Sequence, residues 1–172
     1  MHTYEGKTVG LQHGDVKPNN LMICGETIKI ADYGLAVPIN GSSSPCHRHG
    51  TLDYVAPEVM KGTITDTSDQ YGFAVTYYVL RAGSFPFPQP PSLEEVLAKG
   101  LNRPPPDLSL VPAPERAILM KALSPIPQNR FGGCAEFMRA LARVYDLEFI
   151  VGPEAGRAGV ALRQLRRMQH TA

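Results

Sequence analysis

Four polar residues near the start of the chain have the side-chain types that phosphoryl transfer requires. Asp15, Lys17 and Asn20 share the short segment HGDVKPNN (13–20), and Asp32 follows in the segment IADYGLA (30–36). A loop aspartate can act as a general base, and a lysine can stabilise a phosphate as it moves. Amide and carboxylate oxygens are hard ligands that suit Mg²⁺. The set therefore predicts a base, a cation and two metal ligands in one site.

Two short strands are expected to position these residues. The segment LMICGETIKIAD predicts strands at 21–24 and 28–31, joined by a turn at Gly25. Asp32 follows the second strand directly. Its carboxylate is therefore expected to face the loop aspartate and asparagine across the mouth of this hairpin.

A buried helix is expected to support the site. Thr67-x-x-Gln70 has the form of a capping box, and the segment that follows is apolar on nearly every side until Gly83. A helix that is apolar all round is typical of a domain core. Residues 37–46, by contrast, are rich in Pro, Gly and Ser, which predicts a mobile surface loop.

The remaining elements are also expected to be helical. Ser92-x-x-Glu95 predicts a cap for a short helix that reaches Lys99, and two further helices are expected at about 115–123 and 133–145. The pattern as a whole predicts one strand hairpin followed by helices throughout.

Composition restricts the possible classes of protein. The 172 residues allow one domain, with 43% apolar and 19% charged residues, which is ordinary for a soluble globular protein. The net charge of +1 provides no overall field that would attract nucleic acid or a membrane. Three cysteines argue against a disulfide framework, so a reducing, cytoplasmic location is expected. The first residues have no apolar segment typical of a signal peptide, and no apolar run is long enough to span a bilayer.

Five segments carry a resemblance to a known family. In chain order they are HGDVKPNN (13–20), DYG (32–34), GTLDYVAPE (50–58), SDQYGF (68–73) and PIPQNRF (125–131). They resemble the catalytic loop, the D-F-G motif, the segment that ends in A-P-E, the buried central helix and the late arginine of protein kinases. The sequences of these segments are most similar to those of the eukaryotic-type serine/threonine kinases of bacteria. The resemblance covers roughly residues 10–145.

The resemblance implies a role for each residue of the site. Asp15 would accept or orient the proton of the substrate hydroxyl. Lys17 would lie on the γ-phosphate of ATP, and its presence together with Thr51 is typical of serine/threonine kinases. Asn20 and Asp32 would hold Mg²⁺ against the ATP phosphates.

Further residues would bind the nucleotide or support the site. Met22 would form the floor under the adenine ring, next to the nucleotide contacts of Lys17, Asn20 and Asp32. The residues expected to hold the loops in register are His13, Glu58, Asp69 and Arg130.

Gly14 departs from the kinase pattern. It replaces the arginine of H-R-D, so a phosphate on Ser42, Ser43 or Ser44 would lack its usual cationic partner. H-G-D also occurs in small-molecule phosphotransferases of the aminoglycoside and choline type. Those usually continue H-G-D-x-H, whereas this chain has Lys17, and they have no A-P-E segment. The protein kinase interpretation is therefore favoured over a small-molecule phosphotransferase.

The expected fold is mainly α, a kinase-like C-terminal lobe with a small β-hairpin beside the catalytic loop. Residues 1–147 would form this partial kinase domain, and 148–172 a tail that could be a basic amphipathic helix. No G-x-G-x-x-G loop precedes Asp15, so an N-terminal ATP-binding lobe or upstream segment would have to be supplied separately. Without it, apolar surface on residues 71–80 should be exposed, and the lobe should be inactive alone. The alternative function is a catalytically dead kinase-like module that binds partners.

Overall fold

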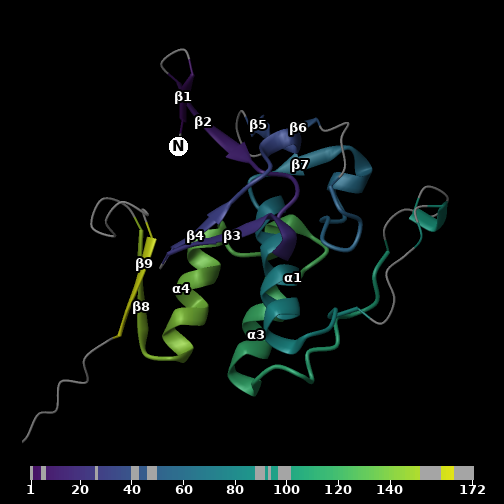
Figure 1. Cartoon of the computed structure of the whole chain (residues 1–172). Helices are drawn as coiled ribbons and strands as arrows, with labels where there is room; N and C mark the ends of the chain where they lie inside the picture. Colours follow the sequence, from purple (N-terminus) through teal and green to yellow (C-terminus); the bar gives the residue numbers. More distant parts are fainter. Residues whose placement is uncertain are drawn as a thin grey trace, which may run out of the picture.

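The computed structural model describes residues 2–4, 7–25, 27–39, 43–45, 50–87, 92, 94–96, 102–151 and 160–164. Its core is formed by three helices: α1 (Ser68–Ala82), α3 (Ala113–Ala122) and α4 (Cys134–Val144). Figure 1 shows α1 in the middle of the molecule, with α3 and α4 packed along it. The two later helices confirm the expected positions to within two residues at each end.

Helix α1 is buried because its side chains are apolar on most sides. Tyr71, Val75 and Tyr78 are almost completely buried, and Phe137 of α4 packs in the same core. The expected exposure of residues 71–80 was therefore wrong for most of this helix, because α3 and α4 cover it. Gly83 ends α1 as expected: its φ of 71° is in the left-handed region that favours glycine.

One of the two predicted capping boxes is present. Ser92 and Glu95 exchange hydrogen bonds, from Ser92 N to Glu95 Oε2 (3.3 Å) and from Glu95 N to Ser92 Oγ (3.1 Å). The expected end of this helix at Lys99 lies outside the described residues. Thr67 does precede α1, but its side chain does not cap the helix. Gln70 instead donates to Phe131 O (2.9 Å), a partner that is distant in sequence.

The described residues contain four antiparallel sheets, so the expectation of a single hairpin was wrong. Strands β3 (Leu21–Cys24) and β4 (Thr27–Ile30) form the predicted hairpin, with the second strand one residue earlier than expected. Two further strands near the start, β1 (His2–Tyr4) and β2 (Lys7–Gln12), pair with each other.

The segment 37–46 was expected to be a mobile loop and instead contains two strands. β5 (Val37–Ile39) pairs with β2, and β6 (Ser43–Pro45) pairs with β7 (Thr63–Thr65). Both pairings join segments that are distant in sequence, so the Pro, Gly and Ser content did not reveal them. Ile39 is also 4% exposed, which anchors this segment to the core.

The described part of the tail is also different from the expected helix. β8 (Leu147–Val151) and β9 (Val160–Gln164) pair antiparallel, and Figure 1 shows them beside α4. β-Branched and aromatic residues in β8 favour a strand. The other residues of the proposed tail, 152–159 and 165–172, lie outside the described residues. Within the part that the structure describes, no helix is both long and apolar enough to cross a membrane.

A buried ion pair connects Glu58, which precedes β7, with Arg130, which precedes α4. Arg130 Nη1 and Nη2 each donate to one carboxylate oxygen of Glu58 at 2.7 Å. Ser68 Oγ donates to the same carboxylate (2.8 Å), and Arg130 also donates to Thr67 O (3.1 Å). The guanidinium lies 5.0 Å from the centre of the Tyr71 ring. Glu58 and Arg130, both expected to hold loops in register, therefore meet at the start of α1.

We expect Arg130→Met to lower the free energy of unfolding by about 3–5 kcal/mol, because Glu58 would be left as a buried charge without its partner. Urea unfolding measures this change. Arg139→Met is the matched control: Arg139 is exposed on α4 and should change stability by less than about 0.5 kcal/mol. Adding Glu58→Gln to Arg130→Met should recover part of the loss. Equal stabilities of the Arg130 and Arg139 variants would contradict the structural role.

Candidate active site

The structure brings four of the predicted site residues into direct contact. Asp15 Oδ2 lies 2.7 Å from Lys17 Nζ, and Asp15 Oδ1 accepts a hydrogen bond from Thr51 N at 2.8 Å. Asn20 Nδ2 donates to the backbone oxygen of Asp15 (2.8 Å) and to its Oδ2 (3.2 Å). Three groups from two segments therefore fix one carboxylate.

Lys17 joins the two segments that meet at this carboxylate. Its ammonium contacts Asp15 and also donates to Thr51 Oγ1 at 2.6 Å. Burial tends to raise the pKa of Asp15, but the Lys17 ammonium and the Thr51 N–H outweigh it and hold this pKa below its usual value. Asp15 is therefore an ionised, weakly basic carboxylate at neutral pH.

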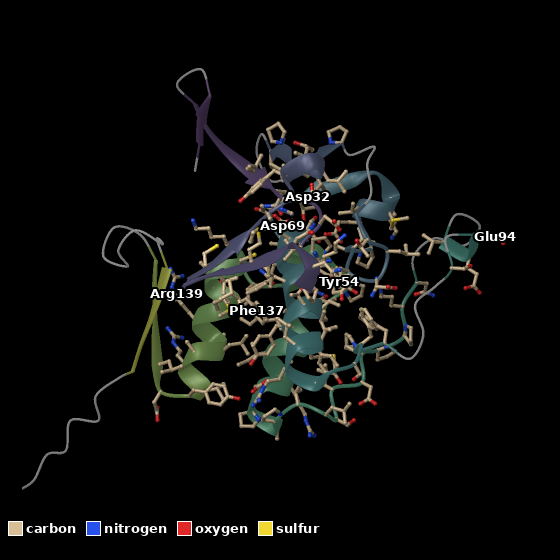
Figure 2. The ribbon with its side chains drawn as sticks, in the orientation of Figure 1. Asp32, Tyr54, Asp69, Glu94, Phe137 and Arg139 are labelled. Carbon is tan, nitrogen blue, oxygen red and sulfur yellow. The ribbon has the colours of Figure 1, made fainter. Side chains whose placement is uncertain are left out.

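Asp69, in the first turn of α1, holds the backbone of the loop. Its carboxylate accepts hydrogen bonds from His13 N (2.6 Å) and Gly14 N (2.9 Å). Burial raises the pKa of Asp69, while these two N–H groups act in the opposite direction. Figure 2 places the labelled Asp69 and Asp32 at the end of α1 where the strands converge. Because Asp69 satisfies two loop amides, the loop is fixed to the rigid core.

His13 links the same loop to the end of β4. Its Nε2 lies 2.9 Å from Ala31 O, and its ring contacts the edge of Tyr33 with a centroid distance of 4.8 Å. Ala31 N donates to Asn20 O at 2.8 Å. The residue before Asp32 therefore contacts both ends of the 13–20 loop.

Asp32 occupies an unusual backbone conformation. Its φ of 64° and ψ of 75° are in the left-handed region, which costs about 1–3 kcal/mol for residues other than glycine. Gly34 N donates to Asp32 Oδ1 at 3.3 Å. Its side chain is exposed and, in the described structure, makes no hydrogen bond or ion pair to Asp15 or Asn20. The Asp32 carboxylate was expected to face Asp15 and Asn20. Contact between this segment and Asn20 is instead made by the backbone of the preceding residue, Ala31, which donates to Asn20 O.

Backbone segments approach each other closely at positions 14 and 50, which explains why both residues are glycine. Gly14 has a φ of 79°, and a Cβ there would lie 2.9 Å from Leu35 O. An arginine at position 14 would therefore be strained and would displace the segment after Asp32. Gly50 approaches the loop from the other side, where a Cβ would collide with Gly14 O. The sequence analysis did not identify Gly50; its position directly before Thr51 was the available signal.

The side chains fit a magnesium ion that is completed by phosphate oxygens. Asn20 uses its amide NH₂ on Asp15, which leaves its Oδ1 for another partner. Asp32 provides an exposed carboxylate. Mg²⁺ typically takes one or two carboxylates together with substrate phosphates rather than an all-protein cage. Accordingly, no group of three or more His, Cys, Asp or Glu side chains suited to a metal occurs among the described residues.

Both faces of the β3–β4 hairpin are exposed. Met22, the proposed floor for adenine, is 54% exposed opposite Lys29. The other face carries Ile23 and Ile28, which are paired across the strands and are 82% and 68% exposed. The sequence analysis missed this apolar face, although the alternation of Leu21 with Ile23 and of Ile28 with Ile30 indicated it.

We expect Asp69→Asn to loosen the catalytic loop, because asparagine offers one acceptor oxygen where the carboxylate offers two. One N–H of His13 or Gly14 would lose its partner, at a cost of about 1–3 kcal/mol. Amide hydrogen exchange at one of these two residues should accelerate at least about fivefold. Asp66→Asn, on an exposed residue before α1, is the matched control and should leave exchange unchanged. Equal exchange rates in both variants would show that Asp69 does not hold the loop.

Comparison with known proteins relates the chain to a family. The protein kinase domain family matches residues 5–141. A serine/threonine-protein kinase of Mycobacterium tuberculosis, PknF, is 35% identical over 143 residues, covering 76% of this chain and 30% of the relative. Pkn1 of Myxococcus xanthus, also a serine/threonine-protein kinase, is 31% identical over 144 residues, covering 77% of this chain and 21% of the relative.

A solved structure shares the fold. The kinase PK-1 of the Cydia pomonella granulovirus superimposes with a TM-score of 0.58 at 20% identity, covering 76% of this chain and 49% of that chain. The chain spans less than a third of the length of the two bacterial relatives. The family match covers most of the chain and includes the loop that Asp69 holds. The chain therefore belongs to the protein kinase family and is similar to bacterial serine/threonine kinases.

Proposed function

We propose that this chain provides the catalytic loop for ATP-dependent phosphoryl transfer to serine or threonine hydroxyls of proteins. The observation that carries the proposal is the Asp15 carboxylate, which Lys17, Thr51 and Asn20 hold in one orientation. Phosphoryl transfer depends mainly on positioning and charge stabilisation, and this arrangement supports both. The names of the bacterial relatives support a protein substrate.

In this proposal each side chain has a separate task. Asp15 orients the substrate hydroxyl and receives its proton; the lowered pKa makes it a weak base, so proton transfer follows most of the bond formation to phosphorus. Lys17 places a positive charge beside both Asp15 and Thr51, where it stabilises the negative charge of the transferred phosphate. Asn20 and Asp32 would hold Mg²⁺, which neutralises charge on the ATP phosphates when bound.

We also propose that a separate ATP-binding lobe or upstream segment completes the site. Met22, which is 54% exposed, would contact one side of the adenine ring, and the additional segment would cover the other side. Such a segment would cover the exposed Met22 from the adenine side, whereas Ile23 and Ile28 form an exposed apolar surface on the opposite face of the hairpin.

A catalytically inactive partner-binding module is the second candidate. The same exposed hairpin face favours it, because an apolar surface of this kind is typical of an interaction site. The two candidates differ in whether the arrangement around Asp15 has a function. Activity measurements on variants of this site therefore separate them.

The first test joins the chain to the ATP-binding lobe of a bacterial relative and measures phosphate transfer to a protein substrate. Asp15→Asn and Lys17→Ala should each lower kcat at least about 100-fold, the scale on which removal of one stabilising group acts. Lys61→Ala, on an exposed residue away from the site, should leave kcat unchanged. Turnover equal to the unmodified enzyme in either site variant would contradict the proposed roles.

The second test uses the 172-residue chain alone. We expect no phosphate transfer and an ATP affinity in the millimolar range or weaker, about −4 kcal/mol, since Lys17, Asn20, Met22 and Asp32 supply only part of a nucleotide site. Radiolabelled ATP turnover and equilibrium binding measure the two quantities. Transfer that is abolished by Asp32→Ala would show that the chain needs no additional lobe.

A further inference from the structure

Arg103 is a partly buried arginine that no step of the proposed reaction uses. Its Nη1 donates to Asp53 O (2.7 Å) and its Nη2 to Leu52 O (2.6 Å). The guanidinium also lies 4.6 Å from the centre of the Phe87 ring. Its Nε is buried and has no hydrogen-bond partner. Among the described residues Arg103 forms no ion pair, so its charge is balanced only by carbonyl dipoles, aromatic rings and the more distant Asp53 carboxylate.

A cavity of about 310 Å³ lies beside this arginine. Tyr71, Phe87 and Leu123 form its buried wall, and Met120, which is 48% exposed, lies at its mouth. Five of the residues that line it are prolines, whose fixed backbone angles make the wall rigid before a ligand binds. Arg103 is the single charged side chain among the described lining residues.

This Arg103 pocket selects for a particular chemical class. A cavity of this volume, mostly apolar with one polar anchor, is typical of a ligand site. The single positive charge can balance one negative charge. A carboxylate therefore fits better than a phosphate dianion, which would keep an unbalanced charge in an apolar cavity. Arg103 Nη1 uses one of its two N–H groups on Asp53 O, which leaves the other as a donor that a carboxylate oxygen can accept from.

We propose that the Arg103 pocket binds an acidic side chain of the protein substrate. The identification of the partner as a substrate rests on the proposed function. The position of the pocket supports it, because Arg103 holds the backbone of Leu52 and Asp53, next to Thr51 at the active site. An acidic residue bound there would place its own chain beside the segment that contacts Asp15.

The test measures binding of two short peptides to the full 172-residue chain, without ATP. The peptides are identical except for a central glutamate or glutamine between apolar residues. We expect the glutamate peptide to bind at least tenfold more tightly, and its advantage to disappear when the carboxylate is protonated at low pH. Equal affinities, or no binding of either peptide, would overturn the proposal.

Two variants test the location. Met120→Glu adds a negative charge at the mouth and should weaken binding of the glutamate peptide at least tenfold, while Leu110→Glu, an exposed apolar residue outside the pocket, is the matched control and should not. Undiminished binding to Met120→Glu would overturn the assignment. Arg103→Gln should also abolish the preference for the glutamate peptide over the glutamine peptide. If the Arg103→Gln variant does not fold, binding to Met120→Glu still tests the location.

A third arm identifies the source of the carboxylate. Phenylbutyrate is titrated as a free small carboxylate. If phenylbutyrate binds and neither peptide does, the proposal that the carboxylate comes from a protein is overturned. Because no arm uses ATP or phosphate transfer, an inactive enzyme leaves the result unaffected. Conversely, an active joined enzyme whose KM for substrate is the same with Met120→Glu would overturn this inference and leave the proposed function intact.

Discussion

The half-buried carboxylate of Asp69 connects the rigid core of this protein to the loop that carries Asp15. It lies in the first turn of α1 and accepts the backbone N–H groups of His13 and Gly14. A carboxylate removed from water needs such partners, and two unpaired loop amides need an acceptor, so each satisfies the other. The position of Asp15 follows from this contact, because it is the next residue of the loop.

A second segment completes the site from the opposite side. Thr51 contacts Asp15 through its backbone and Lys17 through its hydroxyl, and Gly50 permits the close approach that these contacts require. Farther along this segment, Glu58 is fixed by Arg130 and Arg103 holds the backbone oxygens of Leu52 and Asp53. Movement of this segment would therefore change the surroundings of Asp15. This gives a physical connection between the Arg103 pocket and the surroundings of Asp15.

The β3–β4 hairpin is the least stabilised part of the site. The β3–β4 hairpin carries Asn20 at its start and Asp32 just beyond its end, yet both of its faces are exposed. A two-stranded hairpin in water has little stability of its own. Burial of Ile23 and Ile28 by a partner would stiffen the hairpin and so fix the proposed metal ligands.

The sequence by itself determined the features that depend on neighbouring residues: the chemical set at 13–20, the β3–β4 hairpin, the apolar helix α1 with its end at Gly83, and the Ser92–Glu95 cap. Tertiary structure decided features whose partners are distant in the chain. Val37–Ile39 and Ser43–Pro45 became strands because β2 and β7 supplied hydrogen-bond partners. Gln70 bonded to Phe131 instead of capping α1, and the left-handed Gly14 is required by the nearby Leu35 carbonyl. Local patterns record propensity, whereas pairing, burial and close approach depend on which distant segment folds against a residue.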